Sequence, residues 1–343
     1  MGLQKVLVTG SCGLVGSEAA RYFAAQGCQV TGIDNFQRTE WFGQDADVSP
    51  MQKSLERREN YFHSRMDIRD YEAMRFVLEE TKPDLIIHAA AQPSHEKSAE
   101  IPWEDFCVNA QGTVNLLEAV RLHAPDAIFV LVSTNKVYGS LEVECVEKEF
   151  RFELPEKLRR GFDESFSIDR TLHSPFGAAK AAADLMTQEY GRYYGLKTAC
   201  FRCGCITGKA HRGVEQHGFL AYLCKCAKNG KPYTVYGYGG KQVRDNIHAF
   251  DLVRAFHAFA EAPKSGVVYN IGGGYENSCS IIEAMNMIKT KTGLAVATLA
   301  GPKRKADHQC YWTDNGLFQA EYDWKISRFL DDILDELLES GRA

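Results

Sequence analysis

The chain has 343 residues, which is too long for one compact core and long enough for a large domain with a smaller partner. Its hydrophobic fraction of 45% and charged fraction of 25% are those of an ordinary globular protein, and its net charge of −5 excludes a global basic field for nucleic acid or an anionic membrane. Any phosphate must therefore be recognised by local Arg, Lys and backbone N–H groups, which points to a small ligand.

No secretory signal or membrane span is expected, because the first residues lead directly into an apolar strand and no apolar stretch is long enough to cross a bilayer. The 11 cysteines are odd in number and irregularly spaced, so a disulfide framework is not indicated. The pairs Cys203/Cys205 and Cys224/Cys226 lack a matching partner pair for zinc. We expect a cytoplasmic protein with reduced thiols and no metal.

The first half of the chain alternates short apolar runs with helical patterns. Runs that suit buried parallel strands lie at residues 5–9, 30–34, 84–88 and 127–133. Patterns typical of helices lie at residues 17–26, 71–80, 106–123 and 175–194. This alternation predicts an α/β fold with a doubly wound parallel Rossmann sheet.

After residue 195 the pattern is less regular. Strands are expected at residues 198–202, 233–236 and 267–271, and late helices at 280–292 and 326–338. The polar segments 38–58 and 142–160 are long for loops, so we expect insertions near a ligand. The sheet domain is expected to span residues 1–195, with a returning segment at about 236–260, and residues 196–343 to form mainly a smaller C-terminal domain.

The first strand leads into a glycine-rich turn with Gly10, Gly13 and Gly16. Such a turn before a helix lets a pyrophosphate approach the backbone and the positive end of the helix. Asp34 ends the second strand, where an acid binds the ribose 2′-hydroxyl of a dinucleotide and repels a 2′-phosphate. This arrangement favours NAD over NADP, although Arg38 is close enough to accommodate that phosphate.

Two segments carry the chemistry, Val-Ser-Thr-Asn-Lys-Val-Tyr-Gly at residues 132–139 and His-Ser-Pro-Phe-Gly-Ala-Ala-Lys at residues 173–180. They resemble the Ser/Thr and Tyr-x-x-x-Lys segments of the extended short-chain dehydrogenase/reductase family. Matches at residues 88–91, 109–113, 240–245 and 270–273 extend this resemblance over nearly the whole chain. Within the family, Ser-Thr-Asn-Lys-Val-Tyr-Gly and Gly-Lys-Gln-Val-Arg-Asp are similar to segments of the CDP-tyvelose (CDP-paratose) 2-epimerases.

The resemblance implies an NAD-dependent epimerase of a nucleotide-activated sugar, with a CDP-sugar favoured. The bound NAD would take a hydride from C2 and return it to the opposite face of the keto sugar. A nucleotide-sugar 4-epimerase, an oxidoreductase and a catalytically silent NAD- or sugar-nucleotide-binding protein are the alternatives. The family also implies a homodimer formed through the predicted helices 106–123 and 175–194.

By the same resemblance, the residues expected at NAD are Gly10, Cys12, Gly13, Leu14, Val15, Gly16, Asp34, Asn35, Asp67, Ile68, Ala89, Ala90, Ala91, Asn109, Ser133, Lys180 and Arg202. Those expected at the nucleotide sugar are Gln92, Ser94, His95, Thr134, Asn135, Lys136, His173, Gly204, Cys205, His217, Gly218, Tyr236, Arg244 and Arg304.

The catalytic positions implied by the family are Thr134, Phe176 and Lys180. A tyrosine beside a lysine serves as a base because the ammonium stabilises the phenolate, but Phe176 has no proton to exchange. Three interpretations stand: an engineered Tyr→Phe change that traps a ligand, a natural variant in which another group such as His95 or His173 moves the proton, and a natural non-catalytic binding protein. Asn135 and Lys136 replace the acid pair of related dehydratases, so dehydration is disfavoured.

Overall fold

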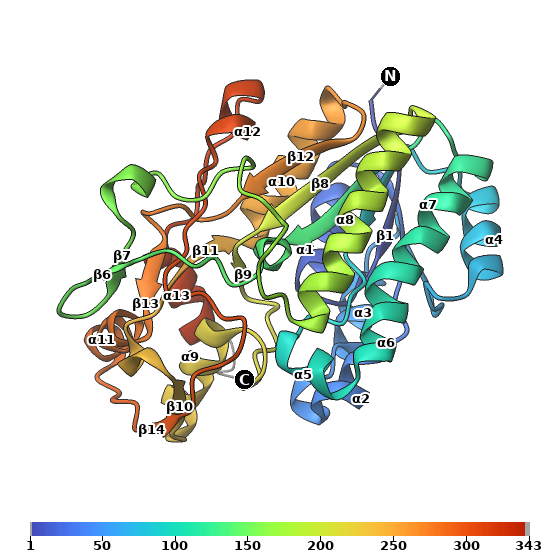
Figure 1. The fold of residues 1–343 in the computed structure, drawn as a ribbon. Coiled ribbons are helices and arrows are strands. Elements are labelled where there is room, and N and C mark those ends of the chain that lie inside the picture. Colours follow the sequence, from blue (N-terminus) through green and yellow to red (C-terminus); the bar gives the residue numbers. More distant parts are fainter. Residues whose placement is uncertain (1, 340–343) are drawn as a thin grey trace.

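The computed structural model describes residues 2–339 and confirms the α/β class with a doubly wound sheet (Figure 1). Seven parallel strands follow one another in the order β12-β8-β5-β4-β1-β2-β3. In chain order they are β1 (Lys5–Thr9), β2 (Gln29–Ile33), β3 (Tyr61–Ser64), β4 (Leu85–His88), β5 (Ile128–Thr134), β8 (Lys197–Cys203) and β12 (Val267–Ile271).

Successive residues of each strand pack into opposite hydrophobic layers, one on each face of the sheet. Val6 and Val8 of β1 pack into one layer with helices α1 (Leu14–Ala25) and α10 (Ala249–Glu261). Leu7 of the same strand packs into the other, with α4 (Tyr71–Thr81), α7 (Gly112–His123) and α8 (Pro175–Tyr194). The period of two in a strand therefore explains the near-continuous apolar runs of the sequence, because both faces are covered.

The sheet takes strands from both halves of the chain. The strands β8 and β12 lie beyond residue 195 and outside the expected returning segment, so the edge of the sheet does not coincide with the expected division there. Helix α10 falls at that returning segment. The strand β3 lay outside the predicted elements. The division into two ligand-binding domains stays a prediction.

The rest of the chain forms smaller units beside the sheet (Figure 1). One hydrophobic cluster joins three helices of this part. These helices are α9 (Phe219–Asn229), α11 (Ile281–Thr292) and α13 (Leu330–Glu339). The short strands are β9 (Cys205–Thr207), β11 (Val243–His248) and β13 (Ser278–Ser280) in one sheet, the pair β10 (Tyr233–Tyr236) and β14 (Thr298–Gly301), and the hairpin β6 (Val146–Glu147) and β7 (Phe152–Glu153).

Two helix starts differ from the sequence prediction. Helix α1 begins at Leu14, because Gly13 serves as its N-cap and Gly16 lies inside its first turn. Helix α13 begins at Leu330 instead of residue 326, since the backbone N–H groups of Ser327 and Arg328 donate to the buried carboxylate of Asp251. The other predicted helices agree to within a few residues, and the predicted helix 106–123 is preceded by α6 (Pro102–Phe106) and a π turn (Cys107–Gln111).

The two polar segments expected near a ligand differ from one another, because Arg38, Trp41 and Val48 of the first line the large cavity described below. Residues 38–58 are helical, with α2 (Arg38–Phe42), a 3-10 turn (Gln44–Ala46) and α3 (Ser49–Leu55). Residues 142–160 were expected near a ligand, but none of them lines the large cavity described below. Phe152 and Leu154 are instead buried in one cluster with Phe162 and Trp312, so this segment covers a separate hydrophobic cluster.

Within residues 2–339, no helix combines the length and the apolar character needed to cross a membrane. The same residues contain no group of three or more His, Cys, Asp or Glu side chains arranged to hold a metal ion.

Candidate functional site

The glycine-rich turn between β1 and α1 forms one end of a cavity of about 410 Å³. A Cβ on Gly10, which has a φ of 66°, would lie 2.7 Å from the backbone nitrogen of Ala90. A Cβ on Gly16 would lie 2.1 Å from the carbonyl oxygen of Gly10. Glycine is therefore required for this close approach. Because Gly13 caps α1 without a side chain, the first N–H groups of the helix stay available for a pyrophosphate.

Asp34 lies beside this turn at the end of β2. Its carboxylate accepts hydrogen bonds from the backbone N–H groups of Cys12 and Phe36, each at 2.9 Å. Burial raises the pKa of this carboxyl, while these two hydrogen bonds oppose the rise. The carboxylate also lines the cavity, where it fits a ribose hydroxyl.

Asn35, Asp67 and Ile68 continue the cavity wall next to Asp34. The side-chain amide of Asn35 donates to Asp67 at 3.0 Å, and Arg69 forms a 2.5 Å ion pair with the same carboxylate. Trp41 of α2 lies on this wall as well. A fixed polar edge beside an aromatic ring suits a purine base.

Thr134, Phe176 and Lys180 also line the cavity. Thr134 ends β5, whereas Phe176 and Lys180 lie one turn apart on α8, whose N-cap hydroxyl of Ser174 accepts from Gly177 at 3.1 Å. The ammonium of Lys180 donates to the carbonyl oxygen of Val132 at 2.8 Å. Burial lowers the pKa of Lys180 to about 8. The strand end and the helix thus bring together the three residues that the sequence motif separates by some forty positions.

A buried charge cluster lies further along the cavity, at Lys136, Arg244 and Asp307. The Asp307 carboxylate lies 3.0 Å from the ammonium of Lys136 and 2.7 Å from the guanidinium of Arg244. Burial raises the pKa of Asp307, but Arg244 and Lys136 outweigh burial and hold it well below its ordinary value. Asp307 is therefore a carboxylate, which can accept a proton or a hydrogen bond but cannot donate one.

Arg304 reaches the same end of the cavity. Its guanidinium stacks over the ring of Tyr236, 3.9 Å from the ring centre, and pairs with Glu96 at 2.5 Å. Arg244 and Arg304 are thus two planar donors in one pocket, and planar donors suit a diphosphate.

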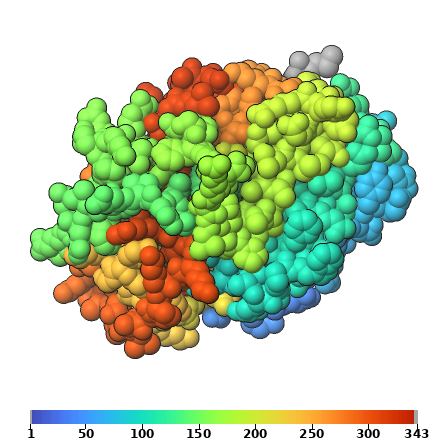
Figure 2. Space-filling view, in the orientation of Figure 1, coloured from blue at the N-terminus to red at the C-terminus, as the bar shows by residue number. Residues whose placement is uncertain are grey.

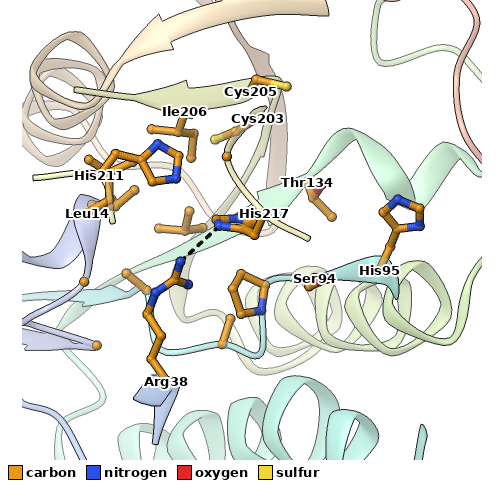
Figure 3. Close-up of a pocket in the computed structure, with 18 of the residues that line it drawn as sticks. Leu14, Arg38, Ser94, His95, Thr134, Cys203, Cys205, Ile206, His211 and His217 are labelled. Atoms are coloured by element: carbon orange, nitrogen blue, oxygen red, sulfur yellow. Dashed lines mark hydrogen bonds between the residues drawn. The ribbon is translucent and has the colours of Figure 1, made fainter. Parts of the chain in front are cut away.

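A contact across the cavity joins the two parts of the chain. Figure 3 shows Arg38 of α2 reaching to His217, with 3.4 Å between the guanidinium and Nδ1 of the imidazole. The same guanidinium donates to the carbonyl oxygen of Arg212 at 3.0 Å. Burial lowers the pKa of His217 well below its ordinary value, so the ring is neutral and can accept this bond. We call residues 209–218 the closing loop.

Most of the predicted site residues line this one cavity. At the turn end they are Gly10, Gly13, Leu14, Val15, Gly16, Asp34, Asn35, Asp67, Ile68, Ala89, Ala90, Ala91, Ser133 and Lys180. At the other end they are Ser94, His95, Thr134, Asn135, Lys136, Gly204, Cys205, His217, Gly218, Tyr236, Arg244 and Arg304. Their roles toward a ligand stay predictions.

Five predicted residues do not line the cavity, because they support its walls. The backbone of Cys12 holds Asp34. Gln92 and Asn109 are buried and donate to the carboxylate of Asp105 at 2.7 and 2.9 Å. The remaining two are His173, whose ring contacts the carbonyl oxygens of Val137 and Thr171, and Arg202, which pairs with Asp184 at 2.8 Å.

Several cavity residues were outside the sequence prediction, among them Gln37, Met66, Asn246 and Asp307. Asp307 follows a basic run in an irregular segment, and its significance appears only when Lys136 is brought within an ion-pair distance. The sequence contains no local signal for such a contact, because the two residues are 171 positions apart.

The parallel sheet with a glycine turn at its carboxyl edge and a second polar pocket beside it defines a dinucleotide-binding enzyme of the Rossmann class. The profile of the "NAD dependent epimerase/dehydratase family" matches residues 6–272, and the chain belongs to this family. NAD is thus its cofactor. The glycine turn and Asp34 fit this cofactor in the way described above.

Curated relatives cover nearly the whole chain. A CDP-paratose 2-epimerase of Salmonella typhi is 34% identical over 328 residues, which are 93% of this chain and 94% of that protein. A probable dTDP-glucose 4,6-dehydratase of Sinorhizobium fredii is 30% identical over 83% of this chain and 75% of that protein. Among solved structures, a UDP-glucose 4-epimerase of Thermus thermophilus in complex with NAD matches with a TM-score of 0.80 and 25% identity, covering 99% of this chain and 100% of that one.

Proposed function

We propose that the chain is an NAD-dependent epimerase of a CDP-linked sugar that inverts C2 by transient oxidation to a keto sugar. The observation that carries this proposal is the single cavity that joins the glycine turn to Thr134, Arg244 and Arg304. The similarity to a CDP-paratose 2-epimerase over 93% of the chain supports the choice of sugar nucleotide.

In this proposal the chain's own residues bind and orient. The N-terminus of α1 holds the cofactor pyrophosphate, Asp34 the adenosine ribose and Lys180 the nicotinamide ribose. NAD supplies an acceptor for hydride from a carbinol carbon. Arg244 and Arg304 hold the diphosphate of the sugar nucleotide, and the hydroxyl of Thr134 orients the reacting oxygen.

Two observations favour epimerisation over dehydration. A dehydratase must protonate a leaving hydroxide, and Asn135 and Lys136 follow Thr134 where related dehydratases place an acid pair. The carboxyl group near Lys136 is Asp307, and its lowered pKa keeps it ionised. Asn135, Lys136 and the ionised Asp307 therefore cannot serve as the carboxylic acid of a dehydration.

Turnover of CDP-paratose and CDP-glucose by the NAD-loaded protein, beside Phe176→Tyr, tests this proposal, with products resolved by NMR. A C2 epimer formed without uptake of solvent deuterium is the expected product, because an internal hydride return exchanges nothing with water. Solvent deuterium at C2 would instead indicate deprotonation next to a carbonyl. No product with either protein, despite bound NAD, would contradict the proposed substrate and leave the silent binding protein as the alternative.

A further inference from the structure

The proposed reaction needs a group that takes a proton from the sugar hydroxyl, and Phe176 cannot do so. Lys180 is an ammonium bound to the carbonyl of Val132, and Asp307 is held between two cations. The ring nitrogens of His173 lie 2.7 and 3.2 Å from two backbone carbonyl oxygens outside the cavity. Burial raises the pKa of Cys205 to about 12, so it is a neutral thiol. Each of these groups either has another partner or is in a protonation state that does not accept the proton of the sugar hydroxyl.

His95 lies directly beside the turn that carries Phe176. It is the first residue of α5 (His95–Glu100), and its backbone carbonyl accepts a 2.7 Å hydrogen bond from the hydroxyl of Ser98. The same hydroxyl accepts from the backbone N–H of Phe176 at 3.1 Å. One serine therefore fixes the spacing between the start of α5 and the start of α8.

The imidazole of His95 faces the cavity. It lies at the same end of the cavity as Thr134 (Figure 3). His95 accepts the hydrogen bond of Ser98 through its backbone carbonyl. Neither nitrogen of its ring has a hydrogen-bond partner among residues 2–339. The preceding loop is rigid, since buried Gln92 donates to both Ser94 and Asp105. A ring held in place with free nitrogens is available to a ligand.

We propose that His95 is the general acid–base for the substrate hydroxyl, in the place of the tyrosine that the family carries at position 176. This rests on the proposed function. In the oxidation, the hydroxyl proton goes to an imidazole nitrogen and the carbon loses hydride to NAD, so the alcohol is oxidised and the cofactor reduced. In the return, the hydride adds to the carbonyl carbon and the imidazolium returns the proton to oxygen.

Burial and the surrounding positive charges keep the free imidazole in the form that accepts a proton. Burial is the largest cause of a lowered His95 pKa, to about 3, followed by Lys136, while Asp307 opposes them and Arg304 and Arg244 add to them. A diphosphate at the two arginines supplies negative charge next to His95. The pKa of the ring therefore rises when substrate binds, which couples its basicity to occupancy.

The remaining charged neighbours of His95 do not change the direction of its pKa shift. Glu96, on the same helix, is paired with Arg304. Lys97 is paired with Glu100. His217, on the closing loop, is a neutral ring.

The test compares wild type, His95→Gln and Phe176→Tyr, each loaded with NAD, with CDP-paratose as the substrate. Substrate affinity is measured by calorimetry and kcat by NMR. His123→Gln is the matched control, since this imidazole lies on α7 and contacts Glu79 at 3.0 Å. We expect His95→Gln to lower kcat by about 10²- to 10⁴-fold while affinity changes by less than about threefold. In wild type kcat should fall at low pH, and the variant should lose this dependence.

Four results would overturn the assignment. A His95→Gln protein with kcat within about threefold of wild type removes the role while leaving the proposed function intact. A loss that appears in affinity instead of kcat makes His95 a binding residue. If wild type is silent and Phe176→Tyr is active, the chain with Phe176 has no base. Silence of both proteins overturns the proposed function and the assignment together.

Discussion

Burial is the largest cause of the pKa shifts of several cavity side chains, whereas the partners of Asp307 outweigh burial. Lys180 shows this most clearly, because burial lowers its pKa from 10.5 to about 8 even though Asp184 acts in the opposite direction. Asp34 and His95 follow the same rule, since the charged form is disfavoured in each. A weakly hydrated site of this kind strengthens every ionic contact with a diphosphate.

The Lys180 pKa has a consequence for stability. Below about pH 8 the ammonium is charged in both folded and unfolded chains, and burial of the charge costs stability. Between the folded pKa of about 8 and the unfolded value of 10.5 the unfolded chain binds the additional proton, so this contribution favours folding as pH rises. We expect wild type to gain stability relative to Lys180→Met across this window, by at most about 1.4 kcal/mol per pH unit. Urea denaturation of both proteins at several pH values measures it, and a parallel pair of curves would contradict it.

The carboxylate of Asp34 is expected to decide between the two nicotinamide cofactors. Asp34→Asn removes the charge that repels a 2′-phosphate and leaves Arg38 nearby. Weaker binding of NAD and a gain of about tenfold in the affinity ratio of NADP to NAD are expected. Fluorescence titration with each cofactor measures the ratio. Asp45→Asn serves as the control, because that carboxylate is exposed and paired with Lys225. An unchanged ratio would assign selectivity to another group.

At the scale of elements, close backbone contacts decide how the site is assembled. Helix α1 passes so near the end of β1 that Gly16 has no room for a side chain. The start of α8 is tied to α5 through Ser98, and the loop before α5 is held by the buried trio Gln92, Asp105 and Asn109. The strand ends supply the residues, and these junctions fix their positions.

Gly16→Ala tests the first junction. An alanine in a helix ordinarily stabilises by about 0.4–1 kcal/mol, but here the new methyl group would lie 2.1 Å from the carbonyl oxygen of Gly10. We expect a loss of at least about 1 kcal/mol and a large loss of NAD affinity, because α1 must move away from the turn. Thermal unfolding and cofactor titration measure the two effects. Gly2→Ala, whose methyl group meets open space, is the control. A stabilised variant that binds NAD normally would refute this.

Sequence patterns predicted six of the seven strands of the large sheet, because two-sided burial leaves a strong apolar signature, as at Ile86 and Ile87 of β4. They missed β3 and helices such as α9 and α10. The Gly turn and Asp34 could be found for the same reason, since each lies at the end of a strand. Thr134 and Lys180 were instead implied by the resemblance of their motifs to those of the family. Asp307 could not, because it lies in an irregular segment and acquires its partners from distant elements. Motif position does not show which way a side chain points, so the sequence could not show that Arg202 pairs with Asp184 and His173 with the carbonyl oxygen of Val137.

At the scale of the whole molecule, one face carries exposed apolar side chains. Helices α6, α7 and α8 lie together on the face seen in Figures 1 and 2, where α8 is yellow-green beside the blue-green residues of α6 and α7. The exposed side chains on these helices include Trp103 at 78% and Tyr193 at 79% exposure, together with Phe106, Leu122, Leu185, Met186 and Tyr194. Such a patch is typical of an interface between subunits.

We expect a homodimer that buries this face. Leu185→Glu should give a monomer, because it places a charge within an apolar interface, and sedimentation velocity measures the change. Leu299→Glu is the matched control, as Leu299 is similarly exposed on β14, which lies apart from this face. A monomeric wild type, or a Leu185→Glu protein that stays dimeric, would place the interface elsewhere.

The contact of Arg38 with the closing loop ties the two parts of the chain together above the cavity. If the proposed function holds, this contact must open before a bound dinucleotide can leave. Each catalytic cycle returns the dinucleotide to its original redox state. The dinucleotide would then stay bound to the protein from one turnover to the next. The protein's rate would depend on one diffusing substrate alone and would be insensitive to the NAD/NADH ratio of its surroundings.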